Sequence, residues 1–384
     1  MAYLHVDRSS SGSIKRIFCG DRGAIGLLEH LPPLLGLSVA PTLLCSASQE
    51  HILLANAWDG NGDVIWIAWA TASLSDGDVW AWFCAHLQKA LAHPQWAGMP
   101  FQPWKWSIIT ELRPGVRQAL QASLPSLHPY FDTDSVALHL TNFSTFNEPD
   151  FRLAAHATTK TSFTKALKRL QDRAPLAWQF LVEDLGKSHW ARIEHPRQGF
   201  GRVTALRRLP YFSLGWREDI TPAAFISEMW NTQTEAFSER ACSLLRRPSS
   251  PEILEAFTVM NNLTDYAVRI VRLRIEGTFG LDMLNLVPQT SVQQLTYSGH
   301  RCVPTVRIRT RNMRATEGRF CKCVEYTEMK LPCAHTLLRC GLQRGMFRGV
   351  PLFYKWTEYK RLYTHGGHPS PRLSFNISFD RLLE

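Results

Sequence analysis

The sequence predicts a mixed α/β fold of the α+β kind, in which strands joined by hairpins come first and helices follow. Three observations support this. Apolar, β-rich runs recur near the start of the chain, a strong hairpin turn joins two of them, and apolar residues three or four apart come next. The chain has 384 residues, of which 45% are apolar and 20% charged. It is therefore long enough for more than one compact unit and apolar enough to fill a core.

The first elements are predicted as strands at residues 35–45, 51–58 and 63–70, with Asp59-Gly60-Asn61-Gly62 as the hairpin turn between the last two. Asp76 can cap a helix whose apolar face carries Trp80, Phe83, Leu87 and Leu91. A short strand at 106–110 follows, and Pro114 opens a second helix through Val116, Leu120 and Leu124. This order of elements is that of a ribonuclease H-like fold, which we expect for residues 1–150.

A helical region is predicted after this core, at residues 151–285. Phe163, Leu167 and Leu170 are spaced as one helix face, and Trp178, Leu181 and Leu185 continue the pattern. Further helices are expected at 223–241 and 252–275. We interpret the region as a helical insertion together with the remainder of the core region. β character returns at 287–310, and the turn-rich residues 366–384 are expected to form a loose tail.

The strongest motif is a C-x-C-x9-C-x-H array near the C-terminus. Three thiols and an imidazole are a donor set that tetrahedral zinc prefers, and Pro332 puts the second pair at a helix start. We therefore predict one structural Zn²⁺ in a small module at residues 286–365. Its predicted ligands are Cys321, Cys323, Cys333 and His335. Cys302 and Cys340 are near enough in sequence to substitute for one of them.

The positive charge of the chain is concentrated in the same region. Residues 301–384 hold 16 Lys or Arg and 6 Asp or Glu, whereas residues 1–300 are balanced. The excess could be a solvated face, or it could be a surface that binds the phosphates of nucleic acid. Tyr354, Trp356, Tyr359 and Tyr363 interleave with basic residues and suit either base stacking or a helix core. The candidate DNA-binding residues are Arg307, Arg309, Arg311, Arg314, Lys322 and Lys330.

The cysteines and the lengths of the apolar runs indicate the cellular compartment that we expect. Nine cysteines occur without a secretion signal, and no apolar run reaches the roughly 18 residues that cross a bilayer. We expect a soluble intracellular protein with a reducing environment around its thiols. Neither a membrane nor a small-molecule cofactor is expected among its partners.

The motif spacing is similar to that of the SWIM-type zinc finger, and Leu331-Pro332-Cys333-Ala334-His335 resembles its form in Mutator-like transposases. The Asp59–Gly62 turn, residues 78–83, Trp190-Ala191-Arg192 and residues 354–359 also resemble this family. The resemblance implies a ribonuclease H-like core interrupted by a helical insertion, with three acidic residues that hold two divalent metals. It also implies DNA as a partner and the nucleus as the location.

The acidic residues of the family are largely missing from this chain. The first position, in the strand at 35–45, is occupied by Ala40, and Pro41 would remove a hydrogen-bond donor there. Glu111 stands in the second position, where the family has Asp. The third position falls at Leu209, in a stretch without carboxylates, so Glu218 or Asp219 would have to substitute. Phe131-Asp132-Thr133-Asp134 replaces a C-x-x-H of the family.

These departures predict a degenerate, catalytically inactive core. Two-metal chemistry needs clustered carboxylates, and Mg²⁺ is expected only if catalysis survives. We expect a zinc-binding, transposase-derived nuclear protein that binds DNA or a protein partner through its SWIM module. One alternative is an active Mutator-like DNA transposase whose acidic residues lie elsewhere. The other is a SWIM adaptor, or a decayed copy, that makes protein contacts only.

Overall fold

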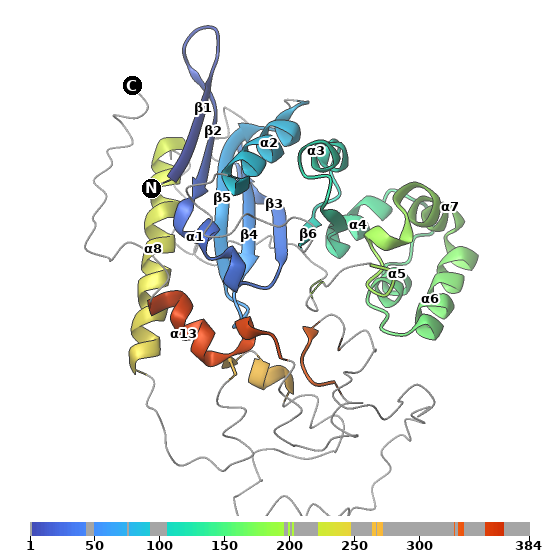
Figure 1. The fold of residues 1–384 in the computed structure, drawn as a ribbon. Coiled ribbons are helices and arrows are strands. Elements are labelled where there is room, and N and C mark those ends of the chain that lie inside the picture. Colours follow the sequence, from blue (N-terminus) through green and yellow to red (C-terminus); the bar gives the residue numbers. More distant parts are fainter. Residues whose placement is uncertain are drawn as a thin grey trace, which may run out of the picture.

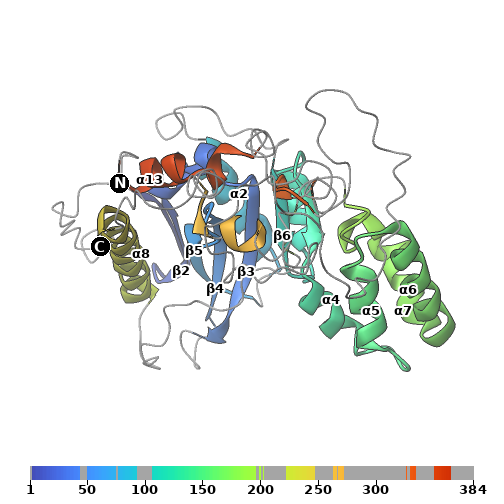
Figure 2. The same cartoon turned by 90° about the horizontal axis from the view of Figure 1, so that it is seen from below.

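The computed structural model describes residues 2–43, 50–74, 77–92, 106–195, 199, 202, 222–246, 263–265, 267–271, 326, 329–333 and 350–364 (Figure 1). These residues form a seven-stranded mixed sheet with helices packed on it and a second group of helices beyond β6 (Figures 1 and 2). The predicted mixed α/β fold is thus confirmed at this level. No helix in the described ranges is long and apolar enough to cross a bilayer.

The sheet has the strand order β1-β2-β5-β4-β3-β6-β7. The first five strands in this order pair antiparallel, whereas β6 pairs parallel with β3 and β7 parallel with β6. The predicted strands are present as β3, β4, β5 and β6. The bounds are Ala2–Arg8 (β1), Ile14–Asp21 (β2), Leu34–Leu43 (β3), Glu50–Trp58 (β4), Val64–Ser73 (β5), Ser107–Thr110 (β6) and His128–Phe131 (β7).

Pro41 lies inside β3, an inner strand of the sheet between β4 and β6. The pairing of β3 with β4 is regular up to Val39 and then shifts before Leu43. The parallel pairing with β6 spans only Leu34 to Leu37. Proline cannot donate a hydrogen bond to a β-ladder. Pro41 is tolerated in β3 because the pairing with β4 is already irregular at this point.

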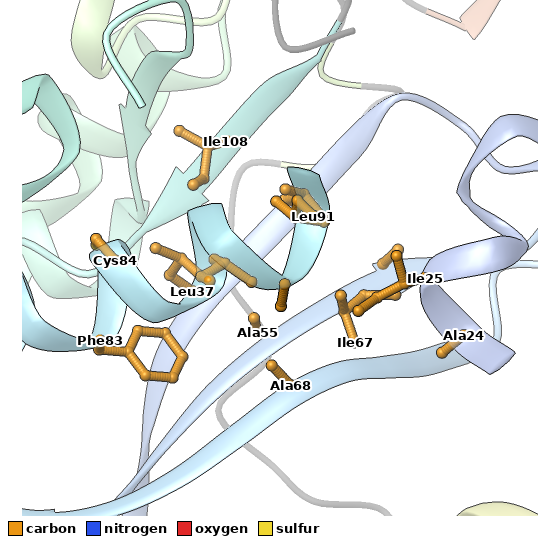
Figure 3. Close-up of a cluster of buried hydrophobic side chains, with 14 of the residues drawn as sticks. Ala24, Ile25, Leu37, Ala55, Ile67, Ala68, Phe83, Cys84, Leu91 and Ile108 are labelled. Atoms are coloured by element: carbon orange, nitrogen blue, oxygen red, sulfur yellow. The ribbon is translucent and has the colours of Figure 1, made fainter. Parts of the chain in front are cut away.

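One face of the sheet packs on α2 (Val79–Ala92) and α3 (Val116–Ser123). Figure 3 shows Phe83, Cys84 and Leu91 of α2 over Leu37 and Ile67 of the strands. These side chains are almost fully buried. The helix predicted over Trp80 to Leu91 is therefore present, but its proposed cap, Asp76, lies outside the described residues. The short α1 (Arg22–Gly26) and η1 (Leu28–His30) border the same core.

The opposite face of the sheet is covered by α8 (Pro222–Arg246), which confirms the helix expected at 223–241. Met229 packs with Trp66 and Trp69 of β5. The side-chain amide of Gln233 accepts from Trp66 N at 2.8 Å and donates to Trp66 O at 2.9 Å. It also donates to Asp21, which caps α1. The pairing of β2 with β5 ends at Ala68. Beyond this point, the Gln233 side chain makes the hydrogen bonds to the Trp66 backbone that a neighbouring strand would make.

The helices after β7 form a compact group with its own core, which lies apart from α8 (Figures 1 and 2). Trp190 is fully buried at its centre, and its indole N–H donates to Leu181 O at 2.9 Å. Phe163 and Leu170 are buried on the face predicted from their spacing. The elements are α4 (Thr133–Leu140), α5 (Glu148–Ala155), α6 (Lys160–Arg173), α7 (Pro175–Gln179), the π-helical η3 (Phe180–Leu185) and η4 (Lys187–His189).

The last described segment contains η9 (Leu352–Tyr354) and α13 (Trp356–Thr364). Tyr354, Tyr359 and Tyr363 are buried, and the last two pack against the main core. Of the two uses considered for these aromatic residues, the structure shows the helix core. Of the helix expected at 252–275, the structure describes residues 263–265 and 267–271. Leu263 forms an isolated β-bridge with Lys355, so the expectation is wrong at 263–264, and the described helix starts at residue 265. The predicted β region 287–310 and tail 366–384 lie outside the described residues.

Candidate catalytic face and candidate zinc site

Glu111 directly follows β6 and lies against the neighbouring strand β3. Its carboxylate accepts a hydrogen bond from the backbone N–H of Val39 at 3.1 Å, and Val39 precedes Ala40 in β3. Its other oxygen pairs with the Arg113 guanidinium at 2.6 Å. The Glu111 side chain is buried. The structure therefore brings together the first and second expected acidic positions, but only one of them carries a carboxylate, and that carboxylate is neutralised by an arginine.

The residues around this point in β3 and β4 are neutral. Gly36 and Ser38 of β3 face the side of the sheet away from α2, because Leu37 and Val39 point into the α2 core. A β-carbon at Gly36 would lie 2.6 Å from the Asn56 amide oxygen, so glycine makes room for this buried side chain. In the described part of the chain, neither polar atom of that amide has a hydrogen-bond partner. Among the side chains of these strands that the structure describes, no second carboxylate joins Glu111.

Asp132 and Asp134, which replace the family's C-x-x-H, have structural contacts. Asp132 is buried and caps α4, accepting from Ser135 N at 2.9 Å. Asp134 pairs with Arg152 at 2.7 Å. Leu209, Glu218 and Asp219 lie outside the described residues. Within the ranges that the structure describes, no group of three or more His, Cys, Asp or Glu is arranged to hold a metal ion.

The predicted zinc motif is described only in part. Cys333 is fully buried, and it is the one predicted ligand among the described residues. Three thiols and an imidazole fit zinc chemically, since this ion prefers sulfur and nitrogen donors. Cys321, Cys323, His335, Cys302 and Cys340 lie outside the described residues.

The predicted DNA-binding residues are described only at Lys330. Its backbone has a positive φ of 55°, and its N–H donates to Tyr326 O at 2.8 Å. Its ammonium group lies 5.8 Å from the Tyr326 ring centre, within cation–π range. Arg307, Arg309, Arg311, Arg314 and Lys322 lie outside the described residues.

The hairpin turn between β4 and β5 holds the C-terminal helix against the sheet. Asp59 accepts from the backbone N–H of Asn61 at 2.9 Å and of Asp63 at 2.8 Å, which closes the turn. Its second oxygen accepts from the Tyr363 hydroxyl of α13, and Arg240 of α8 donates to that hydroxyl at 3.1 Å. The turn resembled a family motif in the sequence, but nothing in the sequence indicated that it binds α8 and α13.

The pKa of the Asp59 carboxyl is set mainly by its burial. The carboxyl is almost fully buried, and this raises its pKa to about 6, with Arg240 opposing the shift and Asp63 adding to it. Burial and the same carboxylate raise the pKa of the Tyr363 phenol well above its ordinary value. Tyr363 therefore stays protonated and remains the hydrogen-bond donor to Asp59.

We expect Asp59→Asn to change how stability depends on pH. The folded pKa of Asp59 is raised, so the stability gained by protonating this group is fully present below about pH 4 and is lost as pH rises through about 6. Asparagine keeps the turn acceptor but does not titrate. Between pH 4 and pH 7, the free energy of unfolding should therefore shift by about 2 kcal/mol in favour of the variant relative to the parent. Urea unfolding at both pH values measures this, and parallel pH profiles would contradict it.

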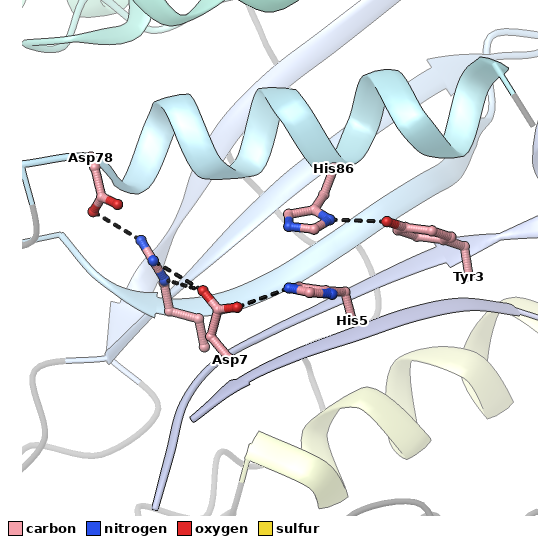
Figure 4. Close-up of polar contacts among 6 residues, drawn as sticks. Tyr3, His5, Asp7, Asp78 and His86 are labelled. Carbon is pink, nitrogen blue, oxygen red and sulfur yellow. Dashed lines mark hydrogen bonds and ion pairs between the residues drawn. The ribbon is translucent and has the colours of Figure 1, made fainter. Parts of the chain in front are cut away.

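A second polar cluster joins β1, β2 and α2, as Figure 4 shows. Arg16 of β2 pairs with Asp7 of β1 at 3.0 Å and with Asp78 before α2 at 2.9 Å. His5 and His86 stack with ring centres 3.9 Å apart. Burial, followed by the charge of His5, lowers the pKa of His86 to about 4, so this ring is neutral near pH 7. The cluster fixes the β1–β2 hairpin, which the sequence analysis did not predict, on α2.

Comparisons with known proteins add no family assignment. The chain matches no protein-family model, and no curated protein matches its sequence.

Proposed function

We propose that this chain is a zinc-binding, transposase-derived nuclear protein whose ribonuclease H-like core has lost two-metal catalysis. It would bind DNA through its C-terminal SWIM-type module. The observation that carries the proposal is the position of Glu111, which stands beside Val39-Ala40 on adjacent parallel strands with its carboxylate paired to Arg113.

The strand order supports a ribonuclease H-like core. Numbered from β3, the strands β5-β4-β3-β6-β7 follow the order 3-2-1-4-5. Strands β3, β4 and β5 pair antiparallel, whereas β6 is parallel to β3 and β7 is parallel to β6. Along the chain, α2 lies between β5 and β6, and α3 lies between β6 and β7. In this arrangement the first and fourth strands are neighbours, which is where the family resemblance puts the first two acidic residues. The helices α6 and α7 then correspond to the start of the insertion expected at 151–285.

The composition of the same face supports loss of catalysis. Two divalent ions need several carboxylates around them, because the metals activate the attacking oxygen and stabilise the leaving one. Position 40 is alanine, Gly36, Ser38 and Asn56 are uncharged, and Glu111 already has a cationic partner. An active transposase would need Glu218, Asp219 or another carboxylate to complete this face, and only then would Mg²⁺ be a cofactor.

We expect no cleavage or joining of DNA by the full-length protein with Mg²⁺ or Mn²⁺. The physical reason is the missing ligand set around Glu111. A labelled DNA duplex is incubated with the parent and with Glu111→Gln, a variant that removes the carboxylate charge at nearly constant side-chain volume. Equal background in both is the expected result. Metal-dependent products made by the parent and absent from Glu111→Gln would establish the active transposase instead.

The proposed DNA contact rests on the charge excess of residues 301–384. A surface that neutralises several phosphates releases condensed counterions, so its affinity falls steeply with salt. Contacts to phosphate carry little sequence information, so the binding should be largely independent of DNA sequence.

We expect Arg311→Ala and Lys322→Ala each to lower the slope of log affinity against log salt by about 0.9, the value for one lost phosphate contact. Arg169→Ala, an exposed arginine on α6, is the matched control and should leave the slope unchanged. Fluorescence anisotropy of the full chain at several salt concentrations measures this. Absence of nucleic-acid binding at low salt, with zinc bound, would favour the SWIM adaptor that contacts only proteins.

A further inference from the structure

The helix α13 lies across the end of the β4–β5 hairpin and beside α8 (Figure 1). Tyr363 of α13 packs on Phe237 of α8 with ring centres 5.2 Å apart, and Tyr359 is buried beside it. The Tyr363 hydroxyl also donates to Asp59 in the hairpin turn. The helix is thus attached to the sheet at a point where a carboxyl group meets an apolar helix face.

The burial of Asp59 depends on this helix. Asp59 is 2% exposed, although Asn61 and Asp63 in the same turn are only half-buried. The turn itself satisfies one carboxyl oxygen, through the backbone N–H groups of Asn61 and Asp63. The second oxygen accepts from Tyr363, and Tyr359 faces the same carboxyl from α13. Departure of α13 would therefore return the second oxygen to water.

One cation and one further carboxylate face Asp59 among the described residues. Arg240 of α8 is the cation, and its guanidinium donates to the Tyr363 hydroxyl at 3.1 Å. Asp63 is the carboxylate. Tyr359 and Tyr363 are neutral, because burial, followed by the charge of Asp59, raises the pKa of both phenols. Burial, partly opposed by Arg240 and increased by Asp63, raises the pKa of the Asp59 carboxyl to about 6.

We propose that α13 is a proton-dependent strap, docked on the β4–β5 turn when Asp59 is protonated and released more easily when this carboxyl is ionised. A protonated carboxyl still accepts from Tyr363 and loses little when it leaves water. An ionised carboxyl gives up its hydration under α13 and recovers it when the helix leaves. The strap would join the predicted C-terminal module to the core, and it requires neither zinc nor DNA.

The direction of the pH dependence follows from the raised pKa of Asp59. Protonation of this group stabilises the docked state, and the stabilisation is fully present below about pH 4 and lost as pH rises through about 6. Release of α13 would restore the ordinary carboxyl pKa of about 3.9. The equilibrium constant for release should therefore rise about tenfold between pH 5 and pH 7.

The test is hydrogen exchange of the full chain, measured by mass spectrometry and corrected for the intrinsic effect of pH on amide exchange. The amides of α13 should lose about tenfold in protection between pH 5 and pH 7 in the parent, and their protection should stay constant in Asp59→Asn. Asp63→Asn is the matched control, because it removes a half-buried carboxylate from the same turn and should keep the pH dependence of the parent.

Low concentrations of urea distinguish release of the strap from global unfolding. Release exposes much less surface than unfolding does, so exchange in α13 should respond weakly to urea. Exchange in β4, at the centre of the core, should accelerate with urea because it requires global unfolding. The α13 amides should also be less protected than those of β4 at every pH.

A second variant covers the case in which Asp59→Asn is unstable. Tyr363→Phe keeps the ring but removes the hydroxyl, whose hydrogen bond favours the ionised form of Asp59. The pKa of Asp59 should then rise further, so the loss of α13 protection between pH 5 and pH 7 should exceed that of the parent. Equal protection and urea dependence in α13 and β4 would overturn the proposal. So would the same pH dependence of α13 in the parent and in both variants.

Discussion

Purified full-length protein is expected to contain close to one zinc ion per chain, and Cys333→Ser is expected to release it. Cys333 is fully buried, and with Cys321, Cys323 and His335 it completes a donor set of three thiols and an imidazole. Binding of structural zinc contributes on the order of 10–16 kcal/mol in small zinc modules, so the loss of one ligand should also unfold the segment around the motif. Metal analysis by mass spectrometry measures the stoichiometry, and limited proteolysis reports the unfolding.

Two other buried cysteines provide the controls for this experiment. Cys19 of β2 and Cys84 of α2 lie in the core, where burial raises the pKa of both thiols and keeps them protonated. Cys84→Ala should therefore keep the zinc, as should Cys302→Ser and Cys340→Ser. A Cys333→Ser protein with its full zinc content would contradict the assignment, and zinc loss in Cys302→Ser or Cys340→Ser would reassign a ligand.

Gly60→Ala is expected to destabilise the protein by about 3 kcal/mol, at the upper end of the range for overpacking. A β-carbon at Gly60 would lie 1.6 Å from the carbonyl oxygen of Phe353, which is backbone and cannot swing away. The carbonyl of the next residue, Tyr354, accepts from Thr264 N at 2.8 Å, and Thr264 in turn donates to Gly60 O at 2.6 Å. Moving η9 away from the turn would break these two hydrogen bonds of Thr264, and also the hydrogen bond from Tyr363 to Asp59.

The matched control is Gly77→Ala, since a β-carbon at this exposed position meets no atom within 4 Å. Urea unfolding compares the free energies, and proteolysis near α13 shows whether the C-terminal helix has left the sheet. If Gly60→Ala unfolds at the same urea concentration as Gly77→Ala, the close packing of the turn against η9 is wrong.

Two of the predicted strands, β4 and β5, are long, apolar and joined by a turn rich in glycine, so both their type and their partner could be inferred. β7 is as short as the predicted β6, but it contains Pro129, and a proline within a run argues against a strand. β1 mixes apolar and polar residues, and it is held by the pair of Arg16 with Asp7 and by the stacking of His5 on His86, which is far from it in the sequence.

Some features of the candidate sites could be predicted from the sequence, and others could not. The sequence predicts a zinc motif because its three cysteines and one histidine are close in sequence and chemically distinctive. Ala40 in place of an acid could be read from the resemblance to the transposase family. The burial of Glu111 against β3 and the buried carboxyl of Asp59 could not be predicted, because each depends on which segments pack together.

The sequence by itself thus determined many of the local elements and the concentration of positive charge, and it predicts the zinc donor set, because all of these follow from residue type and spacing. Tertiary structure decided the rest. It extended the sheet to seven strands, used the tyrosines of α13 as core, and turned Asp59 into the acceptor that holds this helix. The physical reason is that burial and hydrogen bonding between distant segments set the environment of a side chain, and no periodicity along the chain records those distances.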